Sequence, residues 1–147
     1  MKKTTSHNGF TLNELIIVMV ILGIMAAVAV PRYLDSISNA EASAEDAVIS
    51  AIKSGLKAAA NDSLYTNGRA SWPTNPFDVL SEKPAGYSTD ASDADTDGEW
   101  TFNVNGGARI THQRADNSRF EWTYDKGTQV GDNAGVGTLG VRTPINN

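Results

Sequence analysis

Glu14 is the one acidic side chain in a long apolar stretch, GFTLNELIIVMVILGIMAAVAVP, which covers residues 9–31. A carboxylate that lies in hydrocarbon without a partner costs about 2.5 kcal/mol or more, so an acid at such a position indicates a functional role. The chemistry open to it is ion pairing with a nearby cation, or escape of its head group to the membrane surface. A functional role for Glu14 therefore requires a cation close to it.

Three alternate aspartates in the segment DADTDG are the second group that could do chemistry: Asp93, Asp95 and Asp97. Alternate aspartates that end in a glycine are how an EF-hand calcium loop begins. The bidentate acid that such a loop needs at its twelfth position falls on Val104, so this segment is not an EF-hand. The three aspartates would still supply oxygen ligands to Ca²⁺, and a solvated acidic loop is the alternative interpretation.

The sequence offers little for enzymatic catalysis. His112 lies in an expected strand, where a packing or surface role is favoured over catalysis. We find no phosphate-binding glycine loop, nucleophile elbow or histidine-based metal motif in the sequence. The lack of cysteine excludes disulfides and thiolate metal sites. We therefore expect a protein that is not an enzyme.

The net charge of −5 argues against nucleic acid as a partner, because an acidic surface repels phosphates. Loss of Lys2 and Lys3 with a leader would take the net charge from −5 to −7. The alternative is a local basic patch for DNA around the second expected turn, formed by Arg109, Arg114 and Arg119.

The element that must position Glu14 is a helix long enough to cross a membrane. Residues 10–30, at about 1.5 Å per residue, reach roughly 32 Å, which is the thickness of a bilayer core. Lys2 and Lys3 precede this segment without any acid and should stay on the cytoplasmic side. A cleaved secretory signal is the competing interpretation. However, its apolar run is only about 7–15 residues and precedes its small-residue cleavage site, whereas Gly9 comes before the run here.

The order of these features, K-K…G-F-T-L-x-E followed by an apolar stretch with Gly23 and Pro31, resembles the N-terminus of type IV pilins and pseudopilins. These proteins are prepilins with a class III signal. The resemblance covers about the first third of the chain. It implies that a membrane prepilin peptidase cuts between Gly9 and Phe10 and methylates the new amino terminus of Phe10.

Glu14 corresponds to the acid of that family, although Asn13 departs from the apolar residue that is usual before it. Cleavage after Gly9 would create a free amine four residues from Glu14, and in a bundle of such helices the two charges could pair. Two unit charges about 4 Å apart attract by roughly 4 kcal/mol at an effective dielectric constant of 20, and desolvation removes part of this. We therefore expect Glu14, Gly23 and Pro31 to act in assembly. Pro31 favours a kink in the helix, whereas Gly23 is equally a place where the helix bends or an ordinary glycine of a membrane helix.

Beyond the apolar segment, residues 32–60 keep a helical spacing of apolar side chains, with charged residues such as Glu45 largely off this stripe. Short alternating runs at 100–104, 109–112 and 120–124 predict an antiparallel meander. A sheet of about three strands is marginal alone, so the helix should cover its apolar face. The expected fold class is α+β, a long N-terminal helix packed on a small antiparallel sheet, as the pilin resemblance also implies. The stripe consists of Leu34, Ile37, Ala44, Val48, Ile52, Leu56 and Ala59.

Four regions follow from these patterns. They are a leader at 1–9, a transmembrane and filament-core helix at 10–31, an amphipathic helix at 32–60, and a globular loop and sheet region at 61–147. The connection from the helix to the first strand is long for a loop, so part of it should pack on the core. The side chains expected to do so are Trp72, Phe77, Val79 and Leu80.

Together these features predict a structural subunit of a type IV pilus, processed by prepilin peptidase and assembled through its N-terminal helix. The expected partners are further copies of the chain in a helical filament, the peptidase, the inner-membrane assembly machinery and the membrane, with no nucleic acid. We expect the chain in the bacterial inner membrane before assembly and in an extracellular filament afterwards. The alternative is a pseudopilin of a type II secretion system with a calcium-binding C-terminal region; calcium is the one cofactor considered.

Overall fold

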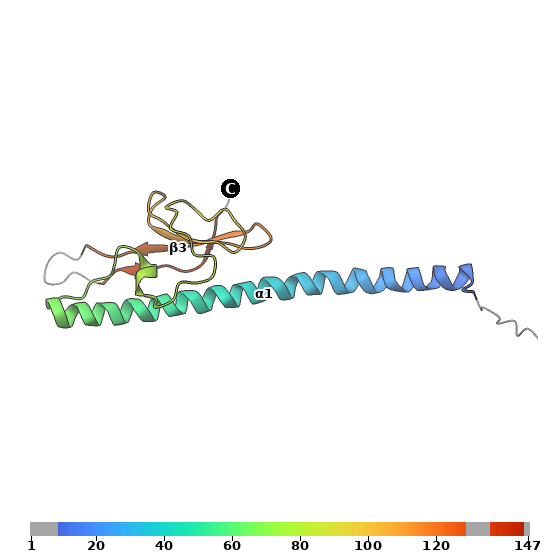
Figure 1. The fold of residues 1–147 in the computed structure, drawn as a ribbon, viewed down its shortest axis with the longest axis horizontal. Helices are drawn as coiled ribbons and strands as arrows, with labels where there is room; N and C mark the ends of the chain where they lie inside the picture. Colours follow the sequence, from blue (N-terminus) through green and yellow to red (C-terminus); the bar gives the residue numbers. More distant parts are fainter. Residues whose placement is uncertain (1–8, 129–135, 146–147) are drawn as a thin grey trace, which may run out of the picture. The chain divides into compact units, whose positions relative to one another are not determined.

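The computed structural model describes residues 9–128 and 136–145 of the 147-residue chain. Within these residues, a long helix, α1 (Leu12–Asn67), is followed by a short 3₁₀ helix, η1 (Pro76–Val79), and five strands (Figure 1). The predicted α+β class is therefore confirmed. The chain divides into two units, Met1–Ser43 and Ala44–Asn147, and α1 contributes to both. The strands are β1 (Trp100–Asn103), β2 (Arg109–Gln113), β3 (Arg119–Asp125), β4 (Thr138–Leu139) and β5 (Thr143–Pro144).

The first unit consists mainly of the N-terminal part of α1, whose apolar side chains are exposed. The large apolar side chains from Phe10 to Ile37 have exposed fractions between 38% and 87%. In the described part of the chain, α1 is the one helix long and apolar enough to cross a membrane. The helix continues through Gly23 and Pro31 without interruption, so a bend there on subunit packing stays a prediction.

The C-terminal end of α1 lies beyond the predicted end near residue 60. Asn61 and Asp62 are exposed, so water competes with the backbone for their polar groups and the helix continues to Asn67. Gly68 ends it with a φ of +69°, a left-handed conformation that glycine adopts without steric cost. Its N–H still donates to the carbonyl of Leu64 at 3.0 Å.

The sheet is antiparallel, with the spatial order β1-β2-β3-β4, and β5 pairs with the first half of β3. Trp100 pairs with His112, and Ile110 pairs with Trp122, so these apolar side chains share the face toward the helix. The three predicted strands are confirmed. Strands β4 and β5 were not predicted, because each has only two residues and shows no alternating pattern.

The core of the second unit lies between α1 and the inner face of the sheet. Ile49, Ile52 and Leu56 from the helix are buried. The predicted stripe is thus correct at Ile52 and Leu56, and Val48 is half-buried against the core. It is wrong at Leu34, Ile37 and Ala44, which are exposed. The sheet contributes Trp100, Phe102, Ile110, Trp122 and Tyr124.

Phe77 in η1 fixes the long connection to this core. Its side chain is fully buried, and its ring centroid lies 4.6 Å from that of Tyr87 and 6.4 Å from that of Trp100. Full burial of such a side chain is worth about 1.5–3 kcal/mol. Trp72, Val79 and Leu80 pack around it on the same core, which confirms the predicted packing of this connection.

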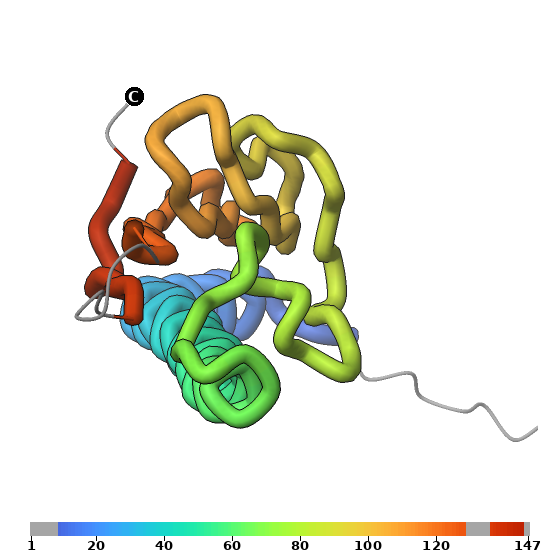
Figure 2. The backbone as a smooth tube through the Cα atoms, turned by 90° about the vertical axis from the view of Figure 1, so that its left-hand side faces the viewer, coloured from blue at the N-terminus to red at the C-terminus, as the bar shows by residue number. Residues whose placement is uncertain are grey.

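A loop before β1 covers the outer face of the sheet. The hydroxyls of Thr101 and Thr111 lie 2.7 Å apart on this face. The N–H of Ala94 donates to Thr111 Oγ1 at 2.8 Å, and Thr101 Oγ1 donates to the carbonyl of Ser92 at 2.7 Å. Figure 2 shows this loop (yellow) on the side of the second unit away from the C-terminal segment (red). Strand β1 and most of β2 are therefore buried on both faces.

Candidate functional site

Thr11 and Glu14 cap the N-terminus of α1 through hydrogen bonds to each other. Glu14 Oε2 accepts hydrogen bonds from the backbone N–H of Thr11 at 2.8 Å and from its hydroxyl at 2.7 Å. The backbone N–H of Glu14 donates in return to Thr11 Oγ1 at 3.3 Å. This arrangement is a capping box, which satisfies backbone donors that a helix start leaves without partners. Glu14 therefore has a structural role while the chain is uncut.

The signal for this cap, Thr-x-x-Glu, is present in the sequence at residues 11–14 and could have predicted it. Gly9 and Phe10 precede the cap and are exposed, with Phe10 at 87%. A Cβ added at Gly9 or at Gly23 would meet nothing within 4 Å. The processing and assembly residues thus lie on an accessible surface, and their roles stay predictions. Lys2 and Lys3 lie outside the described residues.

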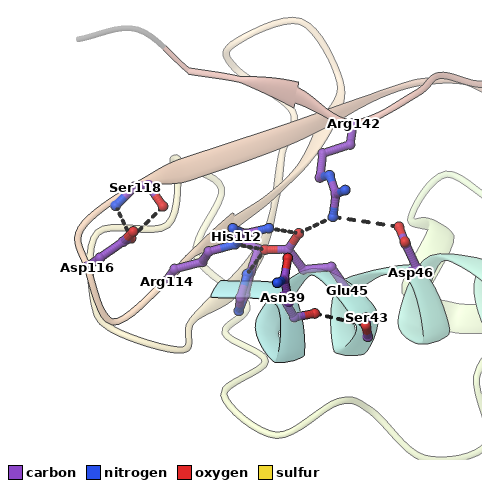
Figure 3. A network of polar contacts seen from close by, with 9 residues as sticks. All are labelled: Asn39, Ser43, Glu45, Asp46, His112, Arg114, Asp116, Ser118 and Arg142. Carbon is purple, nitrogen blue, oxygen red and sulfur yellow. Dashed lines mark hydrogen bonds and ion pairs between the residues drawn. The ribbon is translucent and has the colours of Figure 1, made fainter. Parts of the chain in front are cut away.

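Glu45 is the centre of a second polar site, in the second unit (Figure 3). Its carboxylate accepts two hydrogen bonds from Arg114, from Nε at 2.6 Å and from Nη2 at 2.7 Å. Nδ1 of His112 lies 3.1 Å from Oε1, and Nη1 of Arg142 donates to Oε2 at 2.9 Å. We call these four residues the Glu45 cluster. It joins α1 to the end of β2 and to the C-terminal segment.

The position of Glu45 corrects the sequence analysis, which places it on the solvent side of the helix. Its side chain is fully buried. Burial by itself raises the pKa of Glu45, but the hydrogen bonds from Arg114, His112 and Arg142 and the charge of Arg114 together lower it to about 2. The carboxylate therefore stays charged inside the protein. Its partners lie 67, 69 and 97 residues further along the chain, where no local pattern marks them.

Aromatic rings hold the partners of Glu45 in place. The ring of His112 stacks on Trp100 with 4.2 Å between centroids. The guanidinium carbon of Arg114 lies 4.1 Å from the ring centroid of Phe120, and that of Arg142 lies 5.8 Å from it on the same ring. The predicted packing role of His112 is thus confirmed. A ring surface at this distance attracts a cation by about 0.5–2 kcal/mol.

The predicted calcium ligands are not arranged as a ligand set. Asp93 accepts hydrogen bonds from Arg109 at 3.0 and 2.6 Å and from Asn103 at 2.6 Å, so a guanidinium occupies the position that a cation would need. Burial opposes the charge of Asp93, yet the bonds from Arg109 lower its pKa overall. Asp95 and Asp97 are exposed. Among the described residues, no group of three or more His, Cys, Asp or Glu side chains could hold a metal ion, so the donor set does not fit Ca²⁺.

The basic patch considered for DNA is not formed. Arg109 points to the outer face, where it pairs with Asp93 and, at 3.0 Å, with Glu121. Arg114 is buried in the Glu45 cluster on the inner side. The two arginines thus form ion pairs within the fold, on opposite faces of the sheet.

Comparisons with known proteins match parts of the chain. Residues 4–30 match the model of the prokaryotic N-terminal methylation motif. The chain is 39% identical over 89 residues to the type IV major pilin protein PilE1 of Neisseria gonorrhoeae, which covers 60% of this chain and 36% of PilE1. It is 50% identical over 46 residues to the type IV narrow pilus major component PilA5 of Thermus thermophilus, or 31% and 40% of the two chains. No solved structure matches the chain.

The chain spans well under half the length of these relatives, 36% of PilE1 and 40% of PilA5. Within that span, the methylation motif and the similarity to major pilins support the type IV pilin family. By name the relatives are pilins and pilus components, not enzymes, which agrees with the interpretation of the sequence.

Proposed function

We propose that this chain, whose N-terminal segment is that of type IV pilins, is a structural subunit of a type IV pilus. The observation that carries the proposal is the exposed apolar surface of α1, on which the large side chains from Phe10 to Ile37 are all at least 38% exposed. Such a surface is unstable in water and needs lipid or further apolar surface to cover it. A membrane supplies the first cover and a bundle of identical helices supplies the second.

Processing would occur between Gly9 and Phe10, within the segment that matches the methylation motif. The prepilin peptidase would remove residues 1–9 and methylate the amine of Phe10. The new amine lies four residues before Glu14. The carboxylate would therefore bind a cation, either in place of its hydrogen bonds to Thr11 or in addition to them. This change would convert a helix cap into an assembly contact.

The subunit would wait in the bacterial inner membrane on its apolar helix and then enter an extracellular filament. The assembly machinery of the inner membrane would move it from one environment to the other. Because both environments cover the same apolar side chains, the transfer exchanges lipid contacts for helix contacts at little net loss of burial.

The test is to shear filaments from the surface of producing cells and to determine the N-terminus of their subunit by mass spectrometry. We expect a chain that begins with N-methylated Phe10. The matched control is Gly9→Ser, whose added Cβ meets nothing within 4 Å in the fold and which should impair recognition by the peptidase. It should stay uncut in the membrane, and recovery of uncut wild-type chain in the filaments would contradict the proposal.

A pseudopilin of a type II secretion system would share the same N-terminal processing. Filament location separates the two functions: a pilus extends from the cell surface, whereas a pseudopilus stays within the envelope. Electron microscopy with an antibody to the second unit makes this distinction, and labelled fibres on the cell surface support the pilus.

A further inference from the structure

A groove runs along α1 beside the C-terminal segment and has a volume of about 390 Å³. Asp46, Ile49, Ser50 and Lys53 line it from the helix, and Val141 and Arg142 line it from the C-terminal segment. Val141 is 80% exposed, so an apolar side chain lies at the rim without cover. We call this feature the lysine groove.

The lysine groove carries uncompensated positive charge. Arg142 is paired with Glu45 at 2.9 Å and with Asp46 at 3.7 Å. Lys53 and Lys57 are both exposed, and neither forms an ion pair within the part of the chain that the structure describes. They are four residues apart and so lie on one side of the helix, and Lys57 lines a second hollow of about 320 Å³.

The loop at residues 90–99, which we call the acidic loop, carries the opposite charge. Asp93 is neutralised by Arg109. Asp95 and Asp97 are exposed, and Glu99 accepts hydrogen bonds from the backbone N–H groups of Asp95 and Thr96 at 3.0 and 3.3 Å. Among the described residues, these three acids form no ion pair, so the negative charge of the acidic loop is available to another molecule.

The two surfaces lie on opposite sides of the second unit. The lysine groove lies beside α1, against the inner face of the sheet, whereas the acidic loop is bonded to Thr111 on the outer face. Figure 2 shows the same separation between the C-terminal segment (red) and the loop (yellow). One chain therefore cannot bring its own loop into its own groove, and a contact between them must join two copies.

We propose that the acidic loop of one copy docks in the lysine groove of the next, with Asp95 and Asp97 facing Lys53 and Lys57. A contact between two different surfaces of the same chain does not close on itself, and it propagates as a helical filament. The proposal rests on the proposed function, because it places the contact between neighbouring subunits of the pilus. It gives the globular parts a directional contact in addition to that of the apolar helices.

Cysteine cross-linking tests the contact directly, because the chain contains no cysteine of its own. The variant Ser50→Cys/Thr96→Cys places one thiol in the groove and one on the loop, both at exposed positions. Mild oxidation of filaments should give a ladder of multimers on a non-reducing gel, and each single variant should stop at the monomer. A dimer from Ser50→Cys alone would mean that groove meets groove and would overturn the proposal.

Charge reversal tests the attraction. Lys53→Glu/Lys57→Glu should lower the yield of sheared filaments by about tenfold, because two attractions become repulsions. Adding Asp95→Lys/Asp97→Lys to the same chain should restore the yield. The control Lys53→Arg/Lys57→Arg keeps both positive charges at the same exposed sites and should assemble normally.

The outcomes separate the two proposals. If the wild-type chain forms no filament, the proposed function and this contact both fail. If the wild type assembles and the groove variant assembles equally well, the contact alone is wrong. Loss of the cross-link in the groove variant at an unchanged level of membrane-bound chain distinguishes a lost contact from a misfolded subunit.

Discussion

Glu45 on α1 and Arg114, the residue just after β2, form a buried ion pair with two hydrogen bonds, at 2.6 and 2.7 Å. The side chain of Glu45 is fully buried and that of Arg114 is 6% exposed. In such a place each charge depends on the other, because neither has water to solvate it. The pair therefore fixes the position of the sheet on the second half of α1, within the second unit.

Arg114→Ala should destabilise the second unit by about 3–5 kcal/mol, because it leaves a buried carboxylate without its main partner. All three tryptophans of the chain lie in this unit, so denaturant unfolding of the detergent-solubilised full chain can be followed by their fluorescence. The matched control, Lys53→Ala, removes an exposed cation and should stay within about 0.5 kcal/mol of wild type. The double variant Glu45→Leu/Arg114→Leu should recover much of the loss, and a double variant as unstable as the single one would contradict this role of the pair.

Acid should weaken the fold through Glu45. Its pKa is about 2 in the folded chain, against an ordinary value of 4.5, so the cluster contributes its full stability above about pH 4.5. This contribution is lost as the pH falls from about 4.5 to about 2, and it is on the order of 3 kcal/mol. Tryptophan fluorescence at a series of pH values measures it. In Glu45→Gln this part of the pH dependence should disappear, and an unchanged acid profile in that variant would assign the effect to other carboxylates.

A local sequence pattern predicts contacts within one element but not contacts between distant parts of the chain. The alternation at Trp100, Phe102 and Trp122 reports burial on one face of a sheet, and it placed three strands correctly. The cap at Thr11 is local as well and could have been found from Thr-x-x-Glu. Burial of Glu45 is different, because it depends on partners at least 67 residues away. Strands β4 and β5 likewise depend on pairing with β3, because a strand of two residues is too short to show an alternating pattern.

Tyr124→Phe should destabilise the second unit by about 1–3 kcal/mol. The hydroxyl of Tyr124 donates to the carbonyl of Pro73 at 2.6 Å, and the variant leaves this acceptor without the bond. The ring of Trp72 stacks on Tyr124 with 5.8 Å between centroids, so the apolar packing is kept. Tryptophan fluorescence during denaturation measures the change. A variant as stable as wild type would show that water replaces the hydroxyl.

Removal of calcium should leave the stability of the second unit unchanged. Asp93 already has Arg109 as its cation, and Asp95 and Asp97 do not converge with it on one position. Thermal unfolding in excess EDTA and in millimolar CaCl₂ should therefore give the same midpoint. Arg109→Ala is the matched variant, because it frees the oxygens of Asp93; a calcium-dependent midpoint in the wild type would restore the calcium site predicted from the sequence.

Substitutions of Glu14 can separate its cap on Thr11 from its charge. Glu14→Gln keeps a side-chain oxygen that accepts the Thr11 hydrogen bonds, whereas Glu14→Ala removes cap and charge together. Both variants should insert in the membrane, because the apolar part of α1 is unchanged. If pairing with the amine of Phe10 drives assembly, both should lose most of the sheared filament yield, and normal yield from Glu14→Gln would mean that the helix cap is sufficient. Carbonate extraction of membranes measures insertion, and quantified shearing of cell-surface filaments measures assembly.

Thr11→Ala completes the set of variants. It weakens the cap but keeps the carboxylate of Glu14, and it should therefore assemble far better than Glu14→Ala.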